Sequence, residues 1–568
     1  MQTTQKRKKI IIGVEDFKEI ISKDGYFVDK TLMIEKLIGD KTKVILFTRP
    51  RRFGKTLNQS MIRRFFEDER TEQGDKVDNG HLFDGLAISR CEKETLSHRQ
   101  QYPVIFLSLK SAKQPDFEMA YKSLVDEISK EFKRHKYVLN SEVLSRAEKE
   151  DFELVCDKKA EPIAYAKALA FLSECLARYH GKNTIILIDE YDVPLENAYF
   201  EGFYDEMIKF IRSLFESALK TNAYLEKGVI TGCLRISKES IFTGLNSLVV
   251  DSVLYTGYAD SFGFTEKEVE ELLACYGLTE ELPEVKQWYD GYLLQGMEIY
   301  NPWSLINYTR ERSEGIVPFA KPYWSNTSSN GIIRKMVGDA DDEAREDLET
   351  LINGGTIEKR VHEDITYEDI HQSQDNLWNF LFFTGYLKKI SQRKEGKALY
   401  LEMAIPNLEI ESIYEETIQY WFEQRMKETD WSPLIRVLES GDCEAAEEFI
   451  NTQLMDAISY YDYAESYYHG FMTGLLANNG RYRVLSNREQ GTGRTDIVLC
   501  TKNIRNGKVI ILELKLAMGI ADMKKACDTG LAQIESQQYA KPFIDEGYPD
   551  IKQYVISFYK KECMVETR

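Results

Sequence analysis

The first half of the chain alternates between short apolar runs and longer amphipathic stretches. Apolar runs with the length of buried strands occupy 43–48, 102–109, 184–188 and 227–235. Helical patterns lie between them at 117–135, 160–180 and 203–222. A strand followed by a helix, repeated several times, is typical of an α/β fold with a doubly wound parallel sheet. We therefore predict such a sheet for the first part of the chain.

After residue 263 the period of the apolar positions becomes helical. Thr265 is the expected N-cap of a helix whose first turn is acidic. We predict a helical lid over 264–340. We predict a helical linker domain over 341–450, for which a winged-helix-like module is one option. Within this linker, residues 398–422 are expected to lead through helices into the last domain.

Near the far end, two apolar runs flank a polar turn that contains Asn506-Gly507, the dipeptide best suited to a tight hairpin. The second run, 509–516, has the character of a buried strand but carries Glu513 and Lys515. Side chains alternate faces along a strand, so these two point the same way. Buried charges are costly unless they are paired or bind something. The strand therefore indicates either a functional site or a structural ion pair.

The register of this hairpin decides whether Asp496 joins the same site. Parity places Asp496 on the sheet face of Glu513, but a two-residue Asn506-Gly507 loop would pair it with Ala517. Four residues, roughly 13 Å at strand rise, would then separate Asp496 from the position opposite Glu513. Two carboxylates so far apart cannot bind one metal ion. We predict a longer loop, or a bulge, that slides the register by an even number of residues and brings Asp496 nearly opposite Glu513.

An aspartate followed on the next strand by Glu-x-Lys resembles the core of the PD-(D/E)XK nuclease superfamily. The residues that carry the resemblance are Asp496, Glu513 and Lys515. It implies a restriction-endonuclease-like α/β domain over 451–568, in which Asp496 and Glu513 hold Mg²⁺. Lys515 would then stabilise the nucleophile or the charge that develops on the phosphate.

The same resemblance extends to the helices on both sides of the hairpin. It implies catalytic roles for Glu465 on the preceding helix and for Gln533 on the following one. His469, one turn after Glu465, is a candidate second metal ligand, although a helical surface histidine is the simpler interpretation.

The first predicted strand runs into a loop that ends in Gly54, Lys55 and Thr56, and a helical pattern follows. This order is that of a P-loop, in which backbone N–H groups at the helix N-terminus bind phosphates. Lys55 would reach the β and γ phosphates of ATP, and the Thr56 hydroxyl would bind Mg²⁺. Arg49 stands where the motif has its first glycine. The loop must therefore turn at Pro50 or take a different path.

A second nucleotide signal follows the apolar run 184–188, where Asp189 and Glu190 are adjacent. In P-loop ATPases the first acid serves Mg²⁺, and the second orients or deprotonates the attacking water. The alternative is a buried strand that ends in a solvated acidic loop. Thr231 and Arg235 come where the next strand would end beside the phosphates. They are either nucleotide sensors or ordinary polar loop residues.

The first half as a whole resembles the bacterial AAA-ATPase-like family, which is often joined to a PD-(D/E)XK domain. Its motifs follow in order: VDKT at 28–31, RPRRFGKTL at 49–57, LIDEYDVPL at 187–195, TGCLRISKESIFTGLNSL at 231–248, FGFTEKEV at 262–269, WYDGYLL at 288–294 and IYNPWSL at 299–305. The resemblance implies a P-loop AAA-ATPase-like domain over 1–263. It implies a nucleotide site formed by Gly54, Lys55, Thr56, Asp189 and Glu190, with Thr231 and Arg235 as sensors.

Composition narrows the class of protein further. The chain of 568 residues has a net charge of -19, but residues 451–568 carry 15 Lys and Arg against 14 Asp and Glu. A nearly neutral last domain beside a strongly acidic remainder is weak support for contact with phosphates. Nine cysteines without a Cys-x-x-Cys pair indicate reduced thiols. No signal-peptide core or membrane span is apparent, so we expect a cytoplasmic protein without a membrane partner.

Three hypotheses remain from the residues. In the first, an ATP-driven switch controls a Mg²⁺-dependent nuclease that cleaves nucleic acid, with DNA expected before RNA. In the second, the protein is a nucleotide-dependent regulatory or nucleic-acid-binding protein with a silent nuclease fold; Arg49 and the acidic bulk charge favour it. In the third, bound ATP has a structural role only. The oligomeric state is left open.

Overall fold

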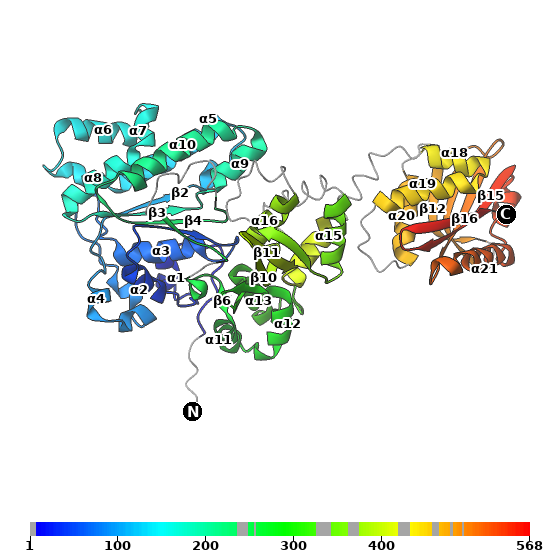
Figure 1. Ribbon diagram of the computed structural model, residues 1–568, viewed down its shortest axis with the longest axis horizontal. Coiled ribbons are helices and arrows are strands. Elements are labelled where there is room, and N and C mark those ends of the chain that lie inside the picture. Colours follow the sequence, from blue (N-terminus) through cyan, green and yellow to red (C-terminus); the bar gives the residue numbers. More distant parts are fainter. Residues whose placement is uncertain are drawn as a thin grey trace. The chain divides into compact units, whose positions relative to one another are not determined.

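The computed structural model describes residues 7–235, 248–254, 257–324, 342–361, 374–417, 432–456, 465–477, 481–490 and 493–567 (Figure 1). The chain divides into two compact units. The first unit comprises residues 1–327 and 356–411, and the second comprises residues 328–355 and 412–568. Among the helices that the structure describes, none combines the length and apolar character that a membrane span requires.

The first unit is built on a five-stranded parallel sheet in the order β2-β3-β4-β1-β5. Its strands are β1 (Val44–Thr48), β2 (Val104–Ser108), β3 (Thr184–Asp189), β4 (Leu225–Gly232) and β5 (Leu248–Asp251). Every residue of β1 and of β3 is buried, as expected for central strands covered on both faces. The prediction of a parallel α/β sheet is confirmed.

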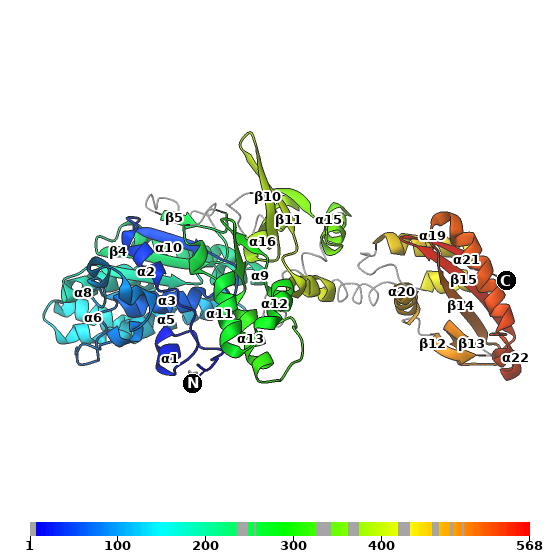
Figure 2. The ribbon, with the colours of Figure 1, turned by 90° about the horizontal axis from the view of Figure 1, so that it is seen from below.

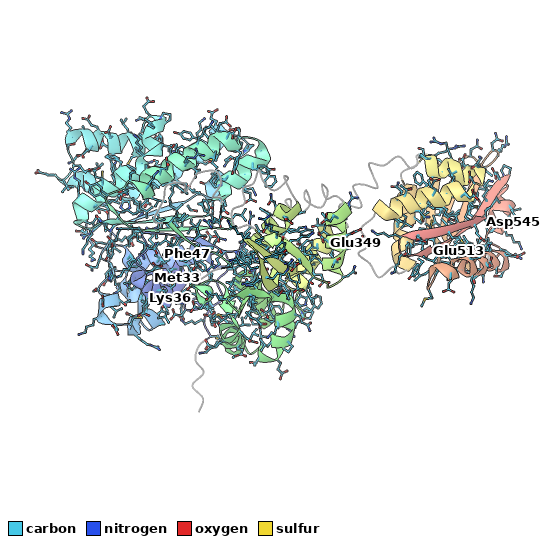
Figure 3. All side chains as sticks on the ribbon, viewed as in Figure 1. Met33, Lys36, Phe47, Glu349, Glu513 and Asp545 are labelled. Carbon is cyan, nitrogen blue, oxygen red and sulfur yellow. The ribbon has the colours of Figure 1, made fainter. Side chains whose placement is uncertain are left out.

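Helices cover both faces of this sheet (Figure 1). One layer holds α1 (Phe17–Ser22), α2 (Leu32–Gly39) and α3 (Lys55–Phe66). Its apolar side chains, such as Met33, pack with Phe47 of β1 in one buried cluster, and both are labelled in Figure 3. The other layer holds α5 (Phe117–Arg134), α8 (Ala168–His180) and α10 (Tyr204–Phe215). The sheet order inserts β4 between β1 and β3, which brings the ends of these three strands to one edge.

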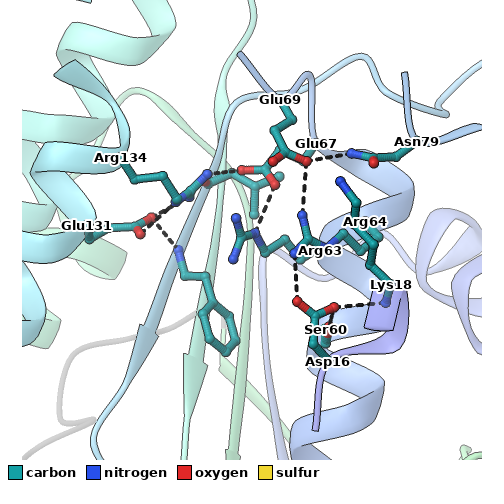
Figure 4. A network of polar contacts seen from close by, with 12 residues as sticks. Asp16, Lys18, Ser60, Arg63, Arg64, Glu67, Glu69, Asn79, Glu131 and Arg134 are labelled. Carbon is teal, nitrogen blue, oxygen red and sulfur yellow. Dashed lines mark hydrogen bonds and ion pairs between the residues drawn. The ribbon is translucent and has the colours of Figure 1, made fainter. Parts of the chain in front are cut away.

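A buried polar network ties the end of α3 to its neighbours (Figure 4). Glu67 is 1% exposed and forms ion pairs with Arg134 of α5 and with Arg63, one turn earlier on α3. Arg64 pairs with Asp16, the N-cap residue of α1, at 2.7 Å. Burial alone would raise the pKa of Glu67, but Arg134 and Arg63 hold it below its usual range. The network fixes α3, and with it the phosphate-binding end of that helix.

The predicted lid region contains β6 (Phe264–Thr265), α11 (Glu266–Tyr276), α12 (Leu282–Tyr289), β7 (Tyr292–Leu294), β8 (Met297–Tyr300) and α13 (Pro302–Ser313). Thr265 caps α11 in a capping box with Glu268, as the sequence predicts. Glu268 also pairs with Lys30 at 2.6 Å, and Lys30 donates to the carbonyl of Asp260 at 2.7 Å. The VDKT segment is therefore a structural tie between the start of the chain and α11.

The interval predicted as a helical linker also contains strands. The interval contains helix α15 (Asp342–Ile352) of the second unit, and in the first unit it contains helix α16 (Gln374–Thr384) and a three-stranded antiparallel sheet in the order β10-β11-β9. The strands are β9 (Ile357–Val361), β10 (Lys388–Glu395) and β11 (Ala398–Ala404). The expectation that 398–404 is helical is wrong. These residues alternate in burial and pair with strands on both sides, so sheet pairing outweighs the helical character of the local sequence.

Glu409 is a buried carboxylate of the first unit and lies in a helical segment that begins at residue 408. Its two oxygens accept hydrogen bonds from the Ser304 hydroxyl at 2.7 and 2.9 Å. It also accepts from the backbone N–H groups of Tyr323 at 2.7 Å and Trp324 at 3.0 Å. Burial raises the pKa of Glu409 to about 7, although these hydrogen bonds oppose the shift.

The second unit is a five-stranded mixed sheet in the order β12-β13-β14-β15-β16. Its strands are β12 (Tyr482–Gln490), β13 (Gly493–Thr501), β14 (Lys508–Leu516), β15 (Asp550–Tyr559) and β16 (Glu562–Thr567), and only the β14–β15 pair is parallel. Helices α18 (Ser432–Ser440), α19 (Cys443–Asp456) and α20 (Glu465–Ala477) pack on one face. Helices α21 (Met523–Ser536) and α22 (Lys541–Glu546) pack on the other. The predicted C-terminal α/β domain is confirmed as a mixed sheet between helices.

Candidate functional sites

The P-loop connects β1 to α3 and brings Lys55 beneath its backbone. Gly54 takes a left-handed φ of 80°, and α3 begins at Lys55. The Lys55 ammonium donates to the carbonyl oxygens of Arg49 and Pro50, both at 3.0 Å. Burial alone would lower the pKa of Lys55, but Cys233, Glu190 and Asp192 raise it on balance. A charged lysine held across such a loop is suited to bind a phosphate chain.

Arg49, the departure from the P-loop pattern, does not face the loop interior. Its side chain is fully buried, and its guanidinium donates to the carbonyls of Thr48 at 2.9 Å and Asp251 at 2.8 Å. It also forms an ion pair with the Asp251 carboxylate on edge strand β5. The left-handed residues of the loop are Arg52 and Gly54. The loop therefore keeps its turn while Arg49 braces it against β5.

Thr56 and Asp189 meet at the expected metal position. The Thr56 hydroxyl donates to the Asp189 carboxylate at 2.8 Å, and the Thr231 hydroxyl donates to its other oxygen at 2.7 Å. Asp189 is fully buried, and burial together with Glu190 raises the pKa of its carboxyl group. A hydroxyl beside a buried carboxylate fits the oxygen ligands that Mg²⁺ prefers. Thr56 and Asp189 are thus the residues that would hold it, and Thr231 orients Asp189.

Glu190 follows Asp189 in a strained backbone conformation. Its φ is 50°, in the left-handed region that non-glycine residues rarely adopt. Its own N–H points at the Thr231 hydroxyl at 3.4 Å, and the next residue, Tyr191, donates to the Thr231 carbonyl at 3.0 Å. Strain held in place by neighbouring bonds is common at functional sites. The left-handed backbone of Glu190 comes directly after the end of β3 at Asp189.

The turn after β4 carries the second predicted sensor. Arg235 is half-buried and lies three residues beyond the end of β4. The preceding turn is held by Asp192, whose carboxylate accepts from the N–H groups of Cys233 at 2.7 Å and Leu234 at 3.0 Å. Burial raises the pKa of Asp192 to about 6. The structure thus positions Thr231 directly against Asp189, and it places Arg235 on the adjoining turn.

Lys110 is a residue at this site that sequence reasoning missed. It follows β2, and its ammonium donates to the Thr56 hydroxyl at 2.8 Å and lies 3.9 Å from the Asp189 carboxylate. A second ion pair at 2.8 Å joins it to Glu15. The usable signal was its place directly after an apolar strand, because polar residues at strand ends gather at ligand sites in parallel sheets. The sheet order that puts β2 beside β3 was not apparent from the sequence.

The hairpin of β13 and β14 has the register that the chemistry requires. Ile497 pairs with Leu512 and Cys500 with Val509, so the next position places Asp496 opposite Glu513. Six residues, 502–507, connect the strands in place of a two-residue turn. The register differs by four residues from the one that a simple Asn506-Gly507 loop would impose. The predicted even-numbered slide is confirmed.

Asp496, Glu513 and Lys515 therefore converge on the face covered by α21. An Asp496 oxygen accepts from the N–H of Leu514 at 2.8 Å, and the Lys515 ammonium donates to Glu513 at 2.8 Å. Glu513, labelled in Figure 3, is 1% exposed, and Lys515 is partly exposed. Two carboxylates on neighbouring strands fit Mg²⁺, which commonly takes one or two protein carboxylates and keeps its waters. Among the described residues no group of three or more His, Cys, Asp or Glu forms a metal site.

The flanking helices contribute to this cluster unequally. Glu465 begins α20, and its side chain lies outside the described residues. Gln533 on α21 donates to the Tyr539 hydroxyl at 3.1 Å, and no described contact joins it directly to Asp496 or Glu513. Burial raises the pKa of Tyr539, and the nearby carboxylates raise it further. Tyr539, missed in the sequence, is hydrogen-bonded to Gln533 and lies near enough to the acidic pair for their charges to affect its pKa.

His469, offered as a helical surface histidine or a second metal ligand, contacts the neighbouring strands. It is half-buried on α20, and its Nε2 lies 3.1 Å from the carbonyl oxygen of Asp496. The same nitrogen lies 3.1 Å from the Ser486 hydroxyl. His469 therefore supports the backbone of Asp496.

Comparison with known proteins agrees with the two sites. The family model described as "Predicted AAA-ATPase" matches residues 11–242, and the model of the PD-(D/E)XK nuclease superfamily matches residues 463–568. A similar protein from Azotobacter chroococcum mcd 1, described as "Uncharacterized protein in vnfD 5'region", is 24% identical over 422 residues. That match covers 72% of this chain and 70% of the relative. The family matches support ATPase and nuclease-type activity. Residues 11–242 are thus similar to a predicted AAA-ATPase-like domain, and residues 463–568 are similar to domains of the PD-(D/E)XK nuclease superfamily.

Proposed function

We propose that this protein binds and hydrolyses ATP and couples that reaction to a Mg²⁺-dependent nuclease that cleaves phosphodiester bonds, with DNA as the expected substrate. The observation that carries the proposal is the register of the β13–β14 hairpin, which sets Asp496 opposite Glu513. A structural ion pair would need only Glu513 and Lys515. The convergence of a second carboxylate on the same face is what a metal-dependent hydrolase requires.

In the proposed nuclease, Asp496 and Glu513 hold Mg²⁺, which when bound polarises the phosphate and acidifies a water molecule. Lys515 reaches the same place from the neighbouring position on its face of β14 and stabilises negative charge on the nucleophile or the phosphate. Gln533 acts through the Tyr539 hydroxyl to orient the cluster. Glu465 is proposed as a further acidic residue from α20.

In the proposed ATPase, Lys55 binds the β and γ phosphates, and Thr56 and Asp189 hold Mg²⁺. Glu190 orients and deprotonates the attacking water, which suits a carboxylate close enough to Lys55 for its charge to raise the pKa of that lysine. Thr231 senses the nucleotide through its hydrogen bond to Asp189. Arg235 is proposed as a second sensor from the adjoining turn.

The nuclease half is tested by incubating the full chain with Mg²⁺ and either plasmid, linear duplex or single-stranded substrates. Glu513→Gln keeps the size of the side chain and should reduce cleavage more than about a hundredfold, since even partners beyond the metal's own ligands contribute ten- to hundredfold. Glu546→Gln is the matched control, because Glu546 is exposed on α22 in the same unit. Unchanged cleavage by Glu513→Gln would remove the residue from the mechanism.

The ATPase half and its coupling to cleavage are tested separately. Glu190→Gln should lower ATP turnover by about a hundredfold or more while ATP affinity stays within about threefold, because a general base contributes to the reaction and not to binding. Glu201→Gln, exposed at the end of α9 (Val193–Glu201), is the control. If the nucleotide site governs the nuclease, ATP should change the cleavage rate of the wild type and not that of Glu190→Gln. Equal cleavage with and without ATP would refute the coupling alone.

The alternative is a nucleotide-dependent binding protein with a silent nuclease fold. It predicts ATP-dependent association with nucleic acid and no cleavage under any divalent metal. Arg49 lends it no support, since that side chain is buried against Asp251 and leaves Lys55 and Thr56 in place.

A further inference from the structure

The β10–β11 hairpin of the first unit is more exposed than a structural strand pair needs to be. It projects from the neighbouring elements of its unit (Figure 2). Every residue from Ile390 to Glu395 is exposed, so this part of β10 buries neither of its faces. The exposed end of such a strand either has no function, as a result of neutral sequence drift, or contacts a partner.

The charge of the sheet that carries this hairpin is opposite to that of the chain. The three strands and the β10–β11 turn hold seven Lys and Arg against three Glu, in a protein with a net charge of -19. Arg393 is already engaged in ion pairs with Glu358 and Glu395. Lys394 and Lys397, at the tip, are exposed, and no described residue forms an ion pair or side-chain hydrogen bond with either ammonium. The tip therefore presents two cations that are free to meet an anionic partner.

The root of the hairpin is fixed firmly to the body of the unit. The Lys388 ammonium donates to the carbonyl of Pro406 at 3.0 Å, and the Tyr386 ring stacks on Trp324 with centroids 5.3 Å apart. Gly385 has a φ of 94°, and a Cβ there would come within 2.8 Å of Pro50 in the P-loop. A rigid root means that the tip loses little conformational freedom when it binds, which favours affinity.

We propose that the β10–β11 hairpin is a nucleic-acid-binding arm whose tip lysines, Lys394 and Lys397, contact the phosphate backbone of a duplex. A two-stranded antiparallel ribbon has the dimensions of the major groove. Phosphate contacts by exposed cations position a protein on a duplex without reading its sequence. The choice of nucleic acid over another polyanion rests on the proposed nuclease function. The binding surface itself is separate from Asp496 and Glu513, which belong to the other unit.

The test is the salt dependence of duplex binding by the full-length protein in EDTA, which prevents cleavage. Each phosphate contact contributes about 0.9 to the slope of log K against log salt. Lys394→Gln with Lys397→Gln should therefore reduce the slope by about 1.8. The ratio of variant to wild-type Kd should correspondingly shrink about tenfold between 50 and 200 mM salt. The matched control is Lys182→Gln with Lys209→Gln, which removes the same charge from exposed positions of the same unit and should leave the slope unchanged.

The outcomes separate this proposal from the nuclease proposal. An unchanged salt slope in the tip variant, or an equal reduction of the slope in the control variant, would refute the nucleic-acid-binding arm whatever the cleavage assay gives. A tip variant that loses affinity for poly-glutamate but not for the duplex would also overturn it, because the partner would then be an acidic peptide. A salt slope reduced by about 1.8, together with unchanged cleavage of saturating substrate, would support the nucleic-acid-binding arm and show that the active site is unaffected. Thermal unfolding should match the wild type, since both side chains are exposed.

Discussion

Replacing Arg49 by glycine would restore the regular P-loop pattern, and we expect it to harm the protein. The substitution removes a guanidinium that is fully buried and bonded to two carbonyl groups and to the Asp251 carboxylate. Asp251 would remain on β5 with its negative charge but without its guanidinium partner, although its carboxylate would still accept a hydrogen bond from the N–H of Gly257 at 2.7 Å. A motif-based view predicts tighter ATP binding, and the structure predicts a loosened loop.

The magnitude follows from burial. Removing one partner of a buried ion pair typically costs about 3–5 kcal/mol, because the other charge stays in a low-dielectric interior. That is a large share of the roughly 5–15 kcal/mol that holds a typical domain folded. Arg51, two residues later in the same loop, pairs with Glu196 but is partly exposed. Its loss should cost about 1 kcal/mol or less.

The assay is urea unfolding followed by tryptophan fluorescence, since Trp324 and Trp378 are buried in the first unit. Arg49→Gly and Arg49→Ala should both lower the free energy of unfolding by about 3 kcal/mol or more and should not tighten ATP binding. Arg51→Ala serves as the matched control. Arg49→Met combined with Asp251→Leu should recover most of the loss, because an apolar pair can replace a buried ion pair. Wild-type stability together with tighter ATP binding in Arg49→Gly would refute the reasoning.

Three further changes have defined outcomes. The folded-state pKa of Glu409, about 7, lies above its ordinary value of 4.5, so the free energy of unfolding should fall by about 3 kcal/mol as the pH rises from about 4.5 to 7. Glu409→Gln should remove this pH dependence, and a variant whose stability falls with pH in parallel with the wild type would contradict the prediction. Gly530→Ala puts a Cβ 2.6 Å from Val555, so it should cost the second unit about 1–3 kcal/mol and slow cleavage, while unchanged unfolding and cleavage would mean that α21 yields freely. Lys110→Met removes an ammonium 2.8 Å from the Thr56 hydroxyl and should raise the affinity for Mg²⁺ in the presence of nucleotide about threefold. Titration of Mg²⁺ into the protein with a fluorescent ATP analogue measures this affinity, and weaker Mg²⁺ binding by the variant would mean that Lys110 supports the metal site instead of competing with it.

The β13–β14 hairpin of the candidate nuclease site illustrates what could and could not be predicted from the sequence. Alternation along the strands was enough to put Asp496 and Glu513 on one face, because side-chain parity is a local property. The length of the loop was not local. The Thr501 hydroxyl accepts from the N–H of Lys508 at 3.0 Å, and Tyr548, from beyond α22, donates to the Thr501 carbonyl at 3.0 Å. A tertiary partner thus closes the hairpin, and the turn propensity of Asn506-Gly507 is overridden.

Gly507 shows the same limit at a single residue. Its φ is not positive, so it does not serve the tight turn that the dipeptide suggested. A Cβ there would instead lie 2.2 Å from the carbonyl oxygen of Asn503 and 2.6 Å from the Thr501 hydroxyl. The glycine is required by the close approach of another part of the loop. That reason depends on the folded path and cannot be deduced from the dipeptide.

At the nucleotide site, the motifs identified the residues that lie on the P-loop and on β3. They did not identify Lys110 or Asp251, which reach the site through the order of strands in the sheet. Strand order depends on which long-range pairings form, and a single sequence contains no direct record of them. Of the two residues predicted as nucleotide sensors, Thr231 contacts Asp189, and the role of Arg235 stays a prediction.

The contact between Arg49 and Asp251 has a practical consequence for dividing this chain into pieces. The family match ends at residue 242, before Asp251, although it includes every P-loop residue. Asn58 on α3 likewise donates to the carbonyl of Ser261 at 2.7 Å. An expression fragment cut at residue 242 would hold the whole phosphate-binding motif while its buried arginine had lost its counter-ion. The smallest piece able to bind nucleotide should therefore extend beyond Ser261.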